Sequence, residues 1–185
     1  ADKGLILNPK NTTLLNIDAY PNADFAGLYG HENETDPVCV RSRTGYIIAV
    51  ANCPIIVYSS LQTETALSTM QAEIYAMAQC CKALFPLIMV VKELSGATGL
   101  PSGGPPKMHI TLHKDNTGAL ILAKTVPPQF TPRSKFYALK TIWMREQLVG
   151  MGISVGKTNT KFQWGDICTK MPSVIIFKFL RRLIM

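Results

Sequence analysis

The sequence predicts an α/β fold in which a mixed β-sheet is flanked by helices. β-rich and helical runs alternate along the chain after an antiparallel start, a pattern typical of sheets covered by helices. From Met70 to Val91, apolar side chains recur every three or four residues, which is the spacing of one face of a long helix. The chain has 185 residues, 47% of them hydrophobic, so it can bury a sizeable core. We expect a single domain over residues 1–185, with 1–12 as a lead-in segment.

The first half of the chain supplies the antiparallel start. Its expected elements are, in order, a strand over 14–20, a loop over 27–43, strands over 45–52 and 54–59, and a long helix that begins at Ser68 or Thr69. Pro21 should close or bend the first strand because proline donates no ladder hydrogen bond. The next two strands should form a hairpin around Asn52 and Cys53. Pro86 removes one bond inside the helix and should kink it near Leu84.

The second half alternates strands and helices. Its expected elements are a Gly- and Pro-rich loop over 95–107, a strand over 108–114, a short helix from 116 to 124, a helix over 132–149, a last strand over 153–158 and a mostly helical segment over 164–185. Thr131 should cap the 132–149 helix, with Pro132 at its first position. Gly150 and Gly152 should end it.

Composition limits the classes of function. The net charge of +7 suits a polyanionic partner, although a charge of this size is also ordinary for a globular domain. No run of eighteen or more apolar residues is free of both charge and proline, so we expect no membrane span. The first residues do not have the layout of a signal peptide.

The five cysteines indicate where the protein resides. They are Cys39, Cys53, Cys80, Cys81 and Cys168, an odd number without a Cys-x-x-Cys pair. This favours free thiols over disulfides or zinc ligands. We therefore expect an intracellular, reducing compartment, such as the cytoplasm, a virus-like particle or the nucleus, and not secretion.

Acidic residues fall at the ends of the expected elements. Asp24 follows Asn22 after the first strand, Glu73 opens the long helix, Asp115 ends a strand and Asp166 opens the last helical segment. Carboxylates that converge at one sheet edge can bind Mg²⁺, and two such ions promote phosphodiester hydrolysis. A simpler role for Glu73 stays open, because an acid at a helix start also complements the helix dipole.

Several segments resemble the ribonuclease H domain of copia-type retrotransposon polyproteins. They follow the family's order and are close to its spacing: 20–27 (YPNADFAG), 42–46 (SRTGY), 67–73 (LSTMQAE), 114–119 (KDNTGA), 133–135 (RSK), 145–146 (RE) and 165–170 (GDICTK). The resemblance runs from about residue 4 to the C-terminus. It implies a ribonuclease H-like fold with a five-stranded mixed sheet.

The resemblance also implies a site. Glu73, Asp115 and Asp166 fall on three of the family's four metal-binding carboxylates, which hold two Mg²⁺ or Mn²⁺ ions when the domain is active. The first acid falls on Asn22, which carries no charge, so this position is degenerate. Asp24 would lie on the same face of the strand and is a candidate substitute. If the site is degenerate, the chain needs no metal.

Further departures from the family occur outside the acids. Gln71 replaces a family Glu, while Phe136 and Ile142 stand where the family has His. His113, beside Asp115, could orient a water or be a structural residue, and His31 and His109 have no partners at metal-ligand spacing.

Two basic segments could bind a partner. Arg133, Lys135, Lys140 and Arg145 on the 132–149 helix could line a nucleic-acid groove, but a solvated helix face explains them nearly as well. Residues 177–185 form a basic amphipathic stretch that could contact a membrane or a protein partner. The resemblance instead implies that this helix packs on the sheet.

Three hypotheses for function follow. The chain could hydrolyse the RNA strand of RNA–DNA hybrids with Mg²⁺, or be an impaired domain that still binds nucleic acid. It could also be a domesticated structural or interaction protein that keeps only the fold. Asn22 separates the first hypothesis from the others, and the basic helix separates the second from the third.

Overall fold

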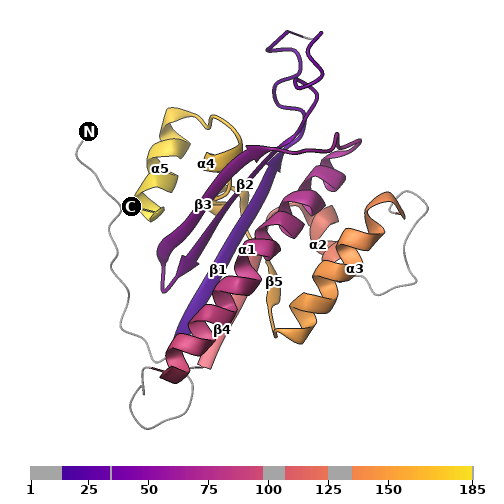
Figure 1. The fold of residues 1–185 in the computed structure, drawn as a ribbon. Helices are drawn as coiled ribbons and strands as arrows, with labels where there is room; N and C mark the ends of the chain where they lie inside the picture. The colour runs from indigo at the N-terminus through magenta and orange to yellow at the C-terminus, as the bar shows by residue number, and fades with distance from the viewer. Residues whose placement is uncertain (1–13, 34, 98–106, 125–134, 185) are drawn as a thin grey trace.

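The computed structural model describes residues 14–33, 35–97, 107–124 and 135–184 (Figure 1). Within these residues the sheet has five strands in the order β3-β2-β1-β4-β5. The strands are β1 (Leu14–Asp24), β2 (Arg43–Val50), β3 (Cys53–Leu61), β4 (Lys107–Lys114) and β5 (Ser154–Lys157). The pairs β3–β2 and β2–β1 are antiparallel, while β1–β4 and β4–β5 are parallel. The predicted mixed sheet is confirmed.

Helices cover both faces of this sheet. They are α1 (Thr69–Ala97), α2 (Thr117–Lys124), α3 (Lys135–Gly150), the 3₁₀ turn η2 (Thr160–Phe162), α4 (Asp166–Thr169) and α5 (Val174–Ile184). The long helix α1 lies across β1 and β2, with α2 and α3 beside it, and α4 lies against the opposite face of these strands (Figure 1). The Ser68 hydroxyl accepts the Gln71 amide at 3.1 Å, so Ser68 caps α1.

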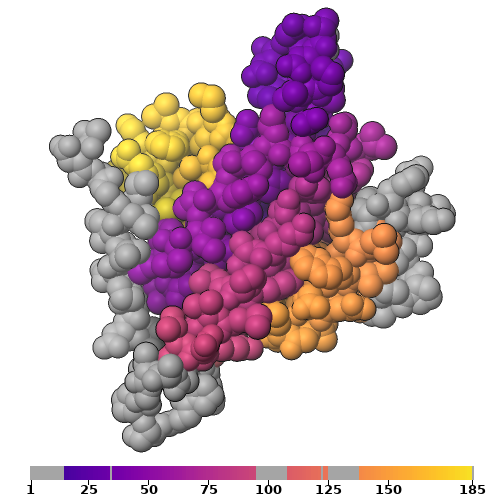
Figure 2. Space-filling model, viewed as in Figure 1, coloured from indigo at the N-terminus to yellow at the C-terminus, as the bar shows by residue number. Residues whose placement is uncertain are grey.

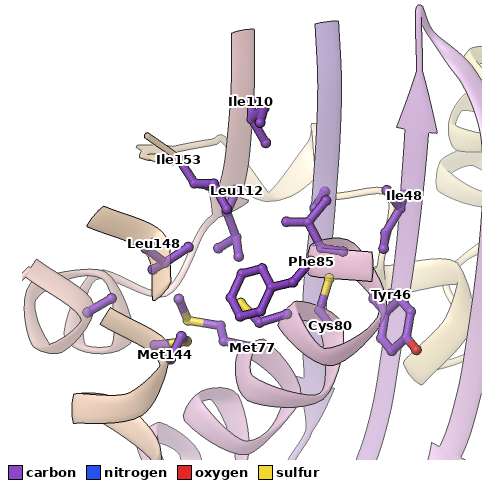
Figure 3. Close-up of a cluster of buried hydrophobic side chains, with 14 of the residues drawn as sticks. Tyr46, Ile48, Met77, Cys80, Phe85, Ile110, Leu112, Met144, Leu148 and Ile153 are labelled. Carbon is purple, nitrogen blue, oxygen red and sulfur yellow. The ribbon is translucent and has the colours of Figure 1, made fainter. Parts of the chain in front are cut away.

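The main core lies between α1 and the sheet (Figure 3). Ile74, Met77, Leu84 and Ile88 from the predicted apolar stripe are fully buried there. They pack against inward-facing residues of β1, β2 and β4, and against Met144 and its neighbours on α3. The stripe between Met70 and Val91 is therefore the core face of α1, as predicted. Each fully buried aliphatic side chain of this kind contributes about 1.5–3 kcal/mol.

A smaller core lies on the other face. Leu180 and Ile184 of α5 pack there with Trp164, Cys168 and residues of β2. The C-terminal helix therefore does pack on the sheet side, although Ile175 and other apolar residues of α5 remain exposed.

Helix α1 is also long and apolar enough to be a candidate membrane span, by length and composition alone, over Thr69–Leu94. Half of its most apolar window is buried inside the fold. A core helix passes the same test, so this is weak evidence for a span.

Several predicted element boundaries were wrong. Strand β1 does not stop before Pro21 but continues to Asp24, and Pro21 pairs with Tyr46 of β2. Helix α1 passes through Pro86 and extends to Ala97, beyond the predicted start of the loop at residue 95. The C-terminal segment is mostly helical, as predicted, and consists of α4 and α5.

The hairpin turn also differs from its predicted position. It lies at Ala51 and Asn52, with φ of 49° and 65°, and Cys53 already belongs to β3. Two successive residues at positive φ are the geometry of a tight type I′ turn, which matches the twist of the paired strands.

The segment between β1 and β2 forms a projection from the body of the molecule (Figure 2). Its turns and bends occupy residues 25–32 and 35–40, close to the predicted loop over 27–43. The predicted cap at Thr131, Pro132 at the first helical position and the lead-in over 1–12 lie outside the described residues.

Candidate active site

The predicted site residues gather around a lysine that the acidic pattern did not reveal. The ammonium of Lys114, at the end of β4, lies 2.8 Å from Oε2 of Glu73 and 3.0 Å from Oδ1 of Asp115. It donates to the Asn22 side-chain oxygen at 3.3 Å and to the Pro21 carbonyl at 3.2 Å. The Lys114 side chain is completely buried. Three of the predicted positions are therefore linked through one ammonium group.

Asn22 connects Asp166, the fourth of the predicted positions, to this cluster. Its side-chain nitrogen donates to Oδ1 of Asp166 at 2.6 Å and to the Thr169 hydroxyl at 2.9 Å. Its oxygen accepts from Lys114, as above. Asn22, Asp166 and Thr169 are all buried. The structure thus brings together Asn22, Glu73, Asp115 and Asp166, which come from β1, α1, the end of β4 and α4.

Small residues allow α4 to approach the sheet closely enough for this contact. A Cβ at Gly165 would collide with the Tyr20 carbonyl oxygen and would lie 3.0 Å from the Asn22 Cβ. A Cβ at Gly45 would collide with Cys168 and Thr169. Glycine at both positions therefore sets the depth of Asp166 beside Asn22.

Burial and the two neighbouring lysines determine the charge states of the acids. Burial raises the pKa of Glu73, and the attraction of Lys114 offsets this only in part. Burial also acts to raise the pKa of Asp115, but Lys114 and backbone amides outweigh it and hold the pKa below its usual value. The two acids differ because Glu73 is the more deeply buried. Burial raises the pKa of Asp166 despite an ion pair with Lys170 at 3.0 Å.

These groups do not fit a divalent metal ion as they stand. In the part of the chain that the structure describes, no three His, Cys, Asp or Glu side chains are arranged to hold a metal. The physical reason is that the Lys114 ammonium lies between Glu73 and Asp115, so a second cation there would be repelled. Asn22 offers one neutral oxygen, and that oxygen accepts from Lys114.

Asp24 is directed elsewhere. Its carboxylate lies against Gly27, where even a Cβ would collide with it. It lines an open cavity of about 680 Å³ beside the cluster, together with basic residues of the 25–43 segment and one that follows α4. These basic residues are His31, Arg41, Arg43 and Lys170. We name this cavity the basic cleft.

The predicted nucleic-acid-binding residues on α3 are only partly described. Arg133 lies outside the described residues, and Lys135 opens α3 but its side chain is not described. Lys140 pairs with Glu64 at 2.6 Å and lies over the Tyr75 ring. Arg145 is half-buried on α3.

His113 belongs to a polar and aromatic stack on the face opposite α1. Its Nε2 lies 2.7 Å from Oδ1 of Asp18, and its ring stacks on Tyr20, which in turn stacks on Trp164. The structural alternative for His113 therefore has direct contacts to support it. The buried Gln163 side chain donates to the carbonyls of Pro21 and His113 and bridges β1 and β4 where they separate.

Comparison with known sequences supports the resemblance to retrotransposon polyproteins that the motifs indicated. The chain is 30% identical over 181 residues to the retrovirus-related Pol polyprotein from transposon RE2 of Arabidopsis thaliana. It is 25% identical over 168 residues to the corresponding polyprotein from transposon TNT 1-94 of Nicotiana tabacum. These matches cover 98% and 91% of this chain but only 11% of each polyprotein. No protein-family model matches the chain.

Comparison of structures identifies the fold. The structure matches LC11-RNase H1, isolated from compost, with a TM-score of 0.53 and 12% sequence identity. The match covers 85% of this chain and 94% of that one. The chain therefore has the ribonuclease H fold, and its predicted resemblance to retrotransposon polyproteins is confirmed.

Proposed function

We propose that this chain is a ribonuclease H-like domain of retrotransposon origin that engages RNA–DNA hybrids but is impaired in cutting them. The observation that carries the proposal is the cluster at the ends of the neighbouring strands β1 and β4. It keeps three carboxylates, Glu73, Asp115 and Asp166, but has the neutral Asn22 and the buried ammonium of Lys114 among them.

The ancestral reaction implied by the resemblance is hydrolysis of the RNA strand with two divalent ions, either Mg²⁺ or Mn²⁺. Such ions lower the pKa of a bound water and stabilise the leaving oxygen. The donor set of this chain does not fit them, so we assign no catalytic step to a metal here. Lys114 instead fixes the positions of Glu73 and Asp115, and Asn22 fixes that of Asp166.

The basic cleft supports engagement of nucleic acid. Arg41 and Arg43 line it, and so does Lys170, which follows α4 and pairs with Asp166 of the cluster. Arginine and lysine side chains along a groove neutralise phosphates and supply affinity that does not depend on sequence. Hybrid recognition would rest on A-like shape and 2′-hydroxyl groups and not on base identity.

The first test is a cleavage assay. We expect no detectable cutting of an end-labelled RNA–DNA hybrid with Mg²⁺ or with Mn²⁺, because the acids are already engaged by Lys114 and Asn22. The measurement is a denaturing gel over a time course, with an active ribonuclease H as the positive control.

The matched control for contamination is Glu73→Gln in the same preparation. Cutting by the unmodified chain that Glu73→Gln abolishes would contradict the proposal. Cutting that both proteins share would indicate a contaminating nuclease, and the assay would be repeated after further purification.

A domesticated structural or interaction protein is the second candidate. The exposed apolar residues of α5, among them Ile175, favour contact with a partner. Measured hybrid binding separates the two, because a purely structural domain should not bind hybrid even at low salt.

A further inference from the structure

We infer that the ammonium of Lys114 acts as a built-in cation that holds the acidic cluster together in place of a divalent metal ion. Its coordination is the first argument. Four oxygens from β1, α1 and the end of β4 surround Nζ: Glu73 Oε2 at 2.8 Å, Asp115 Oδ1 at 3.0 Å, the Pro21 carbonyl at 3.2 Å and Asn22 Oδ1 at 3.3 Å. The three protons of the ammonium are donated to Asp115, Asn22 and Pro21, and Glu73 Oε2, which accepts no hydrogen bond, is held by the short ion pair alone.

Burial is the second argument. The Lys114 side chain has no exposed surface, and those of its partners Glu73 and Asp115 are 6% and 14% exposed. A lysine is almost never fully buried unless it is paired. Removing one partner from a buried ion pair leaves an uncompensated charge, which is strongly destabilising. The fold therefore depends on a positive charge at this point.

Charge balance is the third argument. The cluster contains three carboxylates, on Glu73, Asp115 and Asp166, and two ammonium groups, on Lys114 and Lys170. Three negative charges against two positive charges leave a net charge of −1. One divalent ion added to the cluster would reverse this sign. The cluster is thus close to neutral with protein groups alone.

Asn22 completes this arrangement. A neutral amide at position 22 can accept from Lys114 with its oxygen and donate to Asp166 with its nitrogen. A carboxylate there could only accept, and it would face Asp166 directly. Asn22 and Lys114 therefore make complementary contacts within one cluster.

The inference rests on the proposed function in one respect: the proposed function identifies these carboxylates as the remains of an ancestral metal-binding site. Its test measures stability and not cleavage, so the two proposals can fail separately. The variant is Lys114→Met, which keeps an unbranched apolar side chain but removes the ammonium.

We expect the unmodified chain to have the same melting temperature in EDTA and in millimolar Mn²⁺ or Mg²⁺. Lys114→Met should melt roughly 10 °C lower in EDTA, because Glu73 and Asp115 then lack their cation. Millimolar Mn²⁺ should raise its melting temperature by about 5 °C or more, because the freed oxygens can bind a divalent ion. Thermal unfolding followed by circular dichroism gives both values.

Lys170→Met is the matched control. It also removes an ammonium that contacts the cluster, but from a side chain that is 44% exposed. It should change the melting temperature by no more than about 2 °C and should not create a response to Mn²⁺.

The double variant Lys114→Met/Glu73→Gln removes one charge of each sign. It should melt above Lys114→Met in EDTA and respond less to Mn²⁺. If Lys114→Met does not fold in EDTA, recovery of folded protein with Mn²⁺ or with the added Glu73→Gln change supports the inference. Failure of both to recover it overturns the inference.

Two further outcomes would also overturn it. One is stabilisation of the unmodified chain by Mn²⁺, whatever its activity on hybrids. The other is a folded Lys114→Met variant whose melting temperature does not change with Mn²⁺. Cleavage of hybrid by an unmodified chain that Mn²⁺ does not stabilise would count against the proposed function alone.

Discussion

Asn22 uses both ends of its side-chain amide, and this defines what a carboxylate would do in its place. The nitrogen lies 2.6 Å from Oδ1 of Asp166 and the oxygen accepts from Lys114. Asn22→Asp would keep the second contact but replace the first with two oxygens at hydrogen-bond distance. Because these acids are buried and Lys114 is already shared with Glu73 and Asp115, the two carboxylates could coexist only by sharing a proton or binding a further cation.

We therefore expect Asn22→Asp to lose roughly 2 kcal/mol of stability at pH 7 in EDTA. The loss should shrink as the pH falls towards 4, because one acid of the pair then takes up a proton. Denaturant unfolding at several pH values measures this. Asn22→Ala is the control: it removes the amide hydrogen bonds without adding a charge, so its deficit should vary less with pH. An Asn22→Asp variant as stable as the unmodified chain at pH 7 would contradict this account.

The acids of this cluster could be predicted from their residue types and motifs, but Lys114 was missed. A signal was present in the sequence. Ile110, Leu112 and Lys114 alternate along β4, so Lys114 continues the buried face of that strand. A lysine on the buried face of a strand needs a carboxylate partner, and Asp115 is adjacent. Which oxygens it reaches depends on α1 and β1, and this tertiary contact could not be predicted from local pattern.

At the scale of elements, β1 shows why proline did not end a strand. Pro21 pairs with Tyr46 in the ladder with β2, while the pairing of β1 with β4 ends at Ala19. The carbonyl of Pro21 accepts from the side chains of Lys114 and Gln163 and not from a backbone amide of a neighbouring strand. Since the amide and carbonyl of a strand residue point to the same side, the missing N–H falls where no ladder bond was needed.

The hairpin between β2 and β3 has a sequence that departs from the preferences of its geometry at Ala51. Ala51 and Asn52 both adopt positive φ, and Ala51 carries a side chain that disfavours it. Replacing the pair by Asn-Gly, through Ala51→Asn and Asn52→Gly, should stabilise the fold by about 1 kcal/mol. This corresponds to a rise of roughly 2–4 °C in melting temperature.

Gly152 provides a control in which a side chain is added, and not removed, at a residue with positive φ. It has a φ of 68°, and a Cβ there would have nothing within 4 Å, so Gly152→Ala tests backbone strain without a steric clash. It should destabilise the chain by a similar amount. If the Asn-Gly hairpin melts at or below the temperature of the unmodified chain, the type I′ geometry of this turn is wrong.

At the scale of the whole molecule, the fold class could be predicted because the periodicities are strong. The stripe from Met70 to Val91 faces the sheet. The strands and helices that alternate along the chain form the five-stranded sheet and the helices that cover it. The boundaries at Pro21 and Ala97 could not be predicted, since they depend on which neighbouring strand or helix supplies hydrogen bonds and packing. The geometry of the site could not be predicted for the same reason: its residues come from four separate elements, and their contacts depend on how these elements pack together.

The distribution of charge over the molecule leads to the last prediction. The chain carries a net charge of +7, and Arg41 and Arg43 line the basic cleft. If the cleft holds the backbone of a hybrid, affinity should fall steeply with salt. The double variant Arg41→Ala/Arg43→Ala should reduce the slope of log K against log salt by about 2, because each phosphate that is no longer neutralised lowers the slope by about 0.9.

The matched control is Lys82→Ala/Lys178→Ala, which removes two positive charges from exposed residues of α1 and α5 that do not line the cleft. It changes the net charge equally, so it should leave the slope nearly unchanged if contact with the cleft matters and net charge does not. Fluorescence anisotropy of a labelled hybrid over a salt series measures both variants. Equal slopes for the two double variants would mean that binding is diffuse attraction to a positive chain. No binding of hybrid at low salt would leave the structural or interaction role as the remaining hypothesis for this fold.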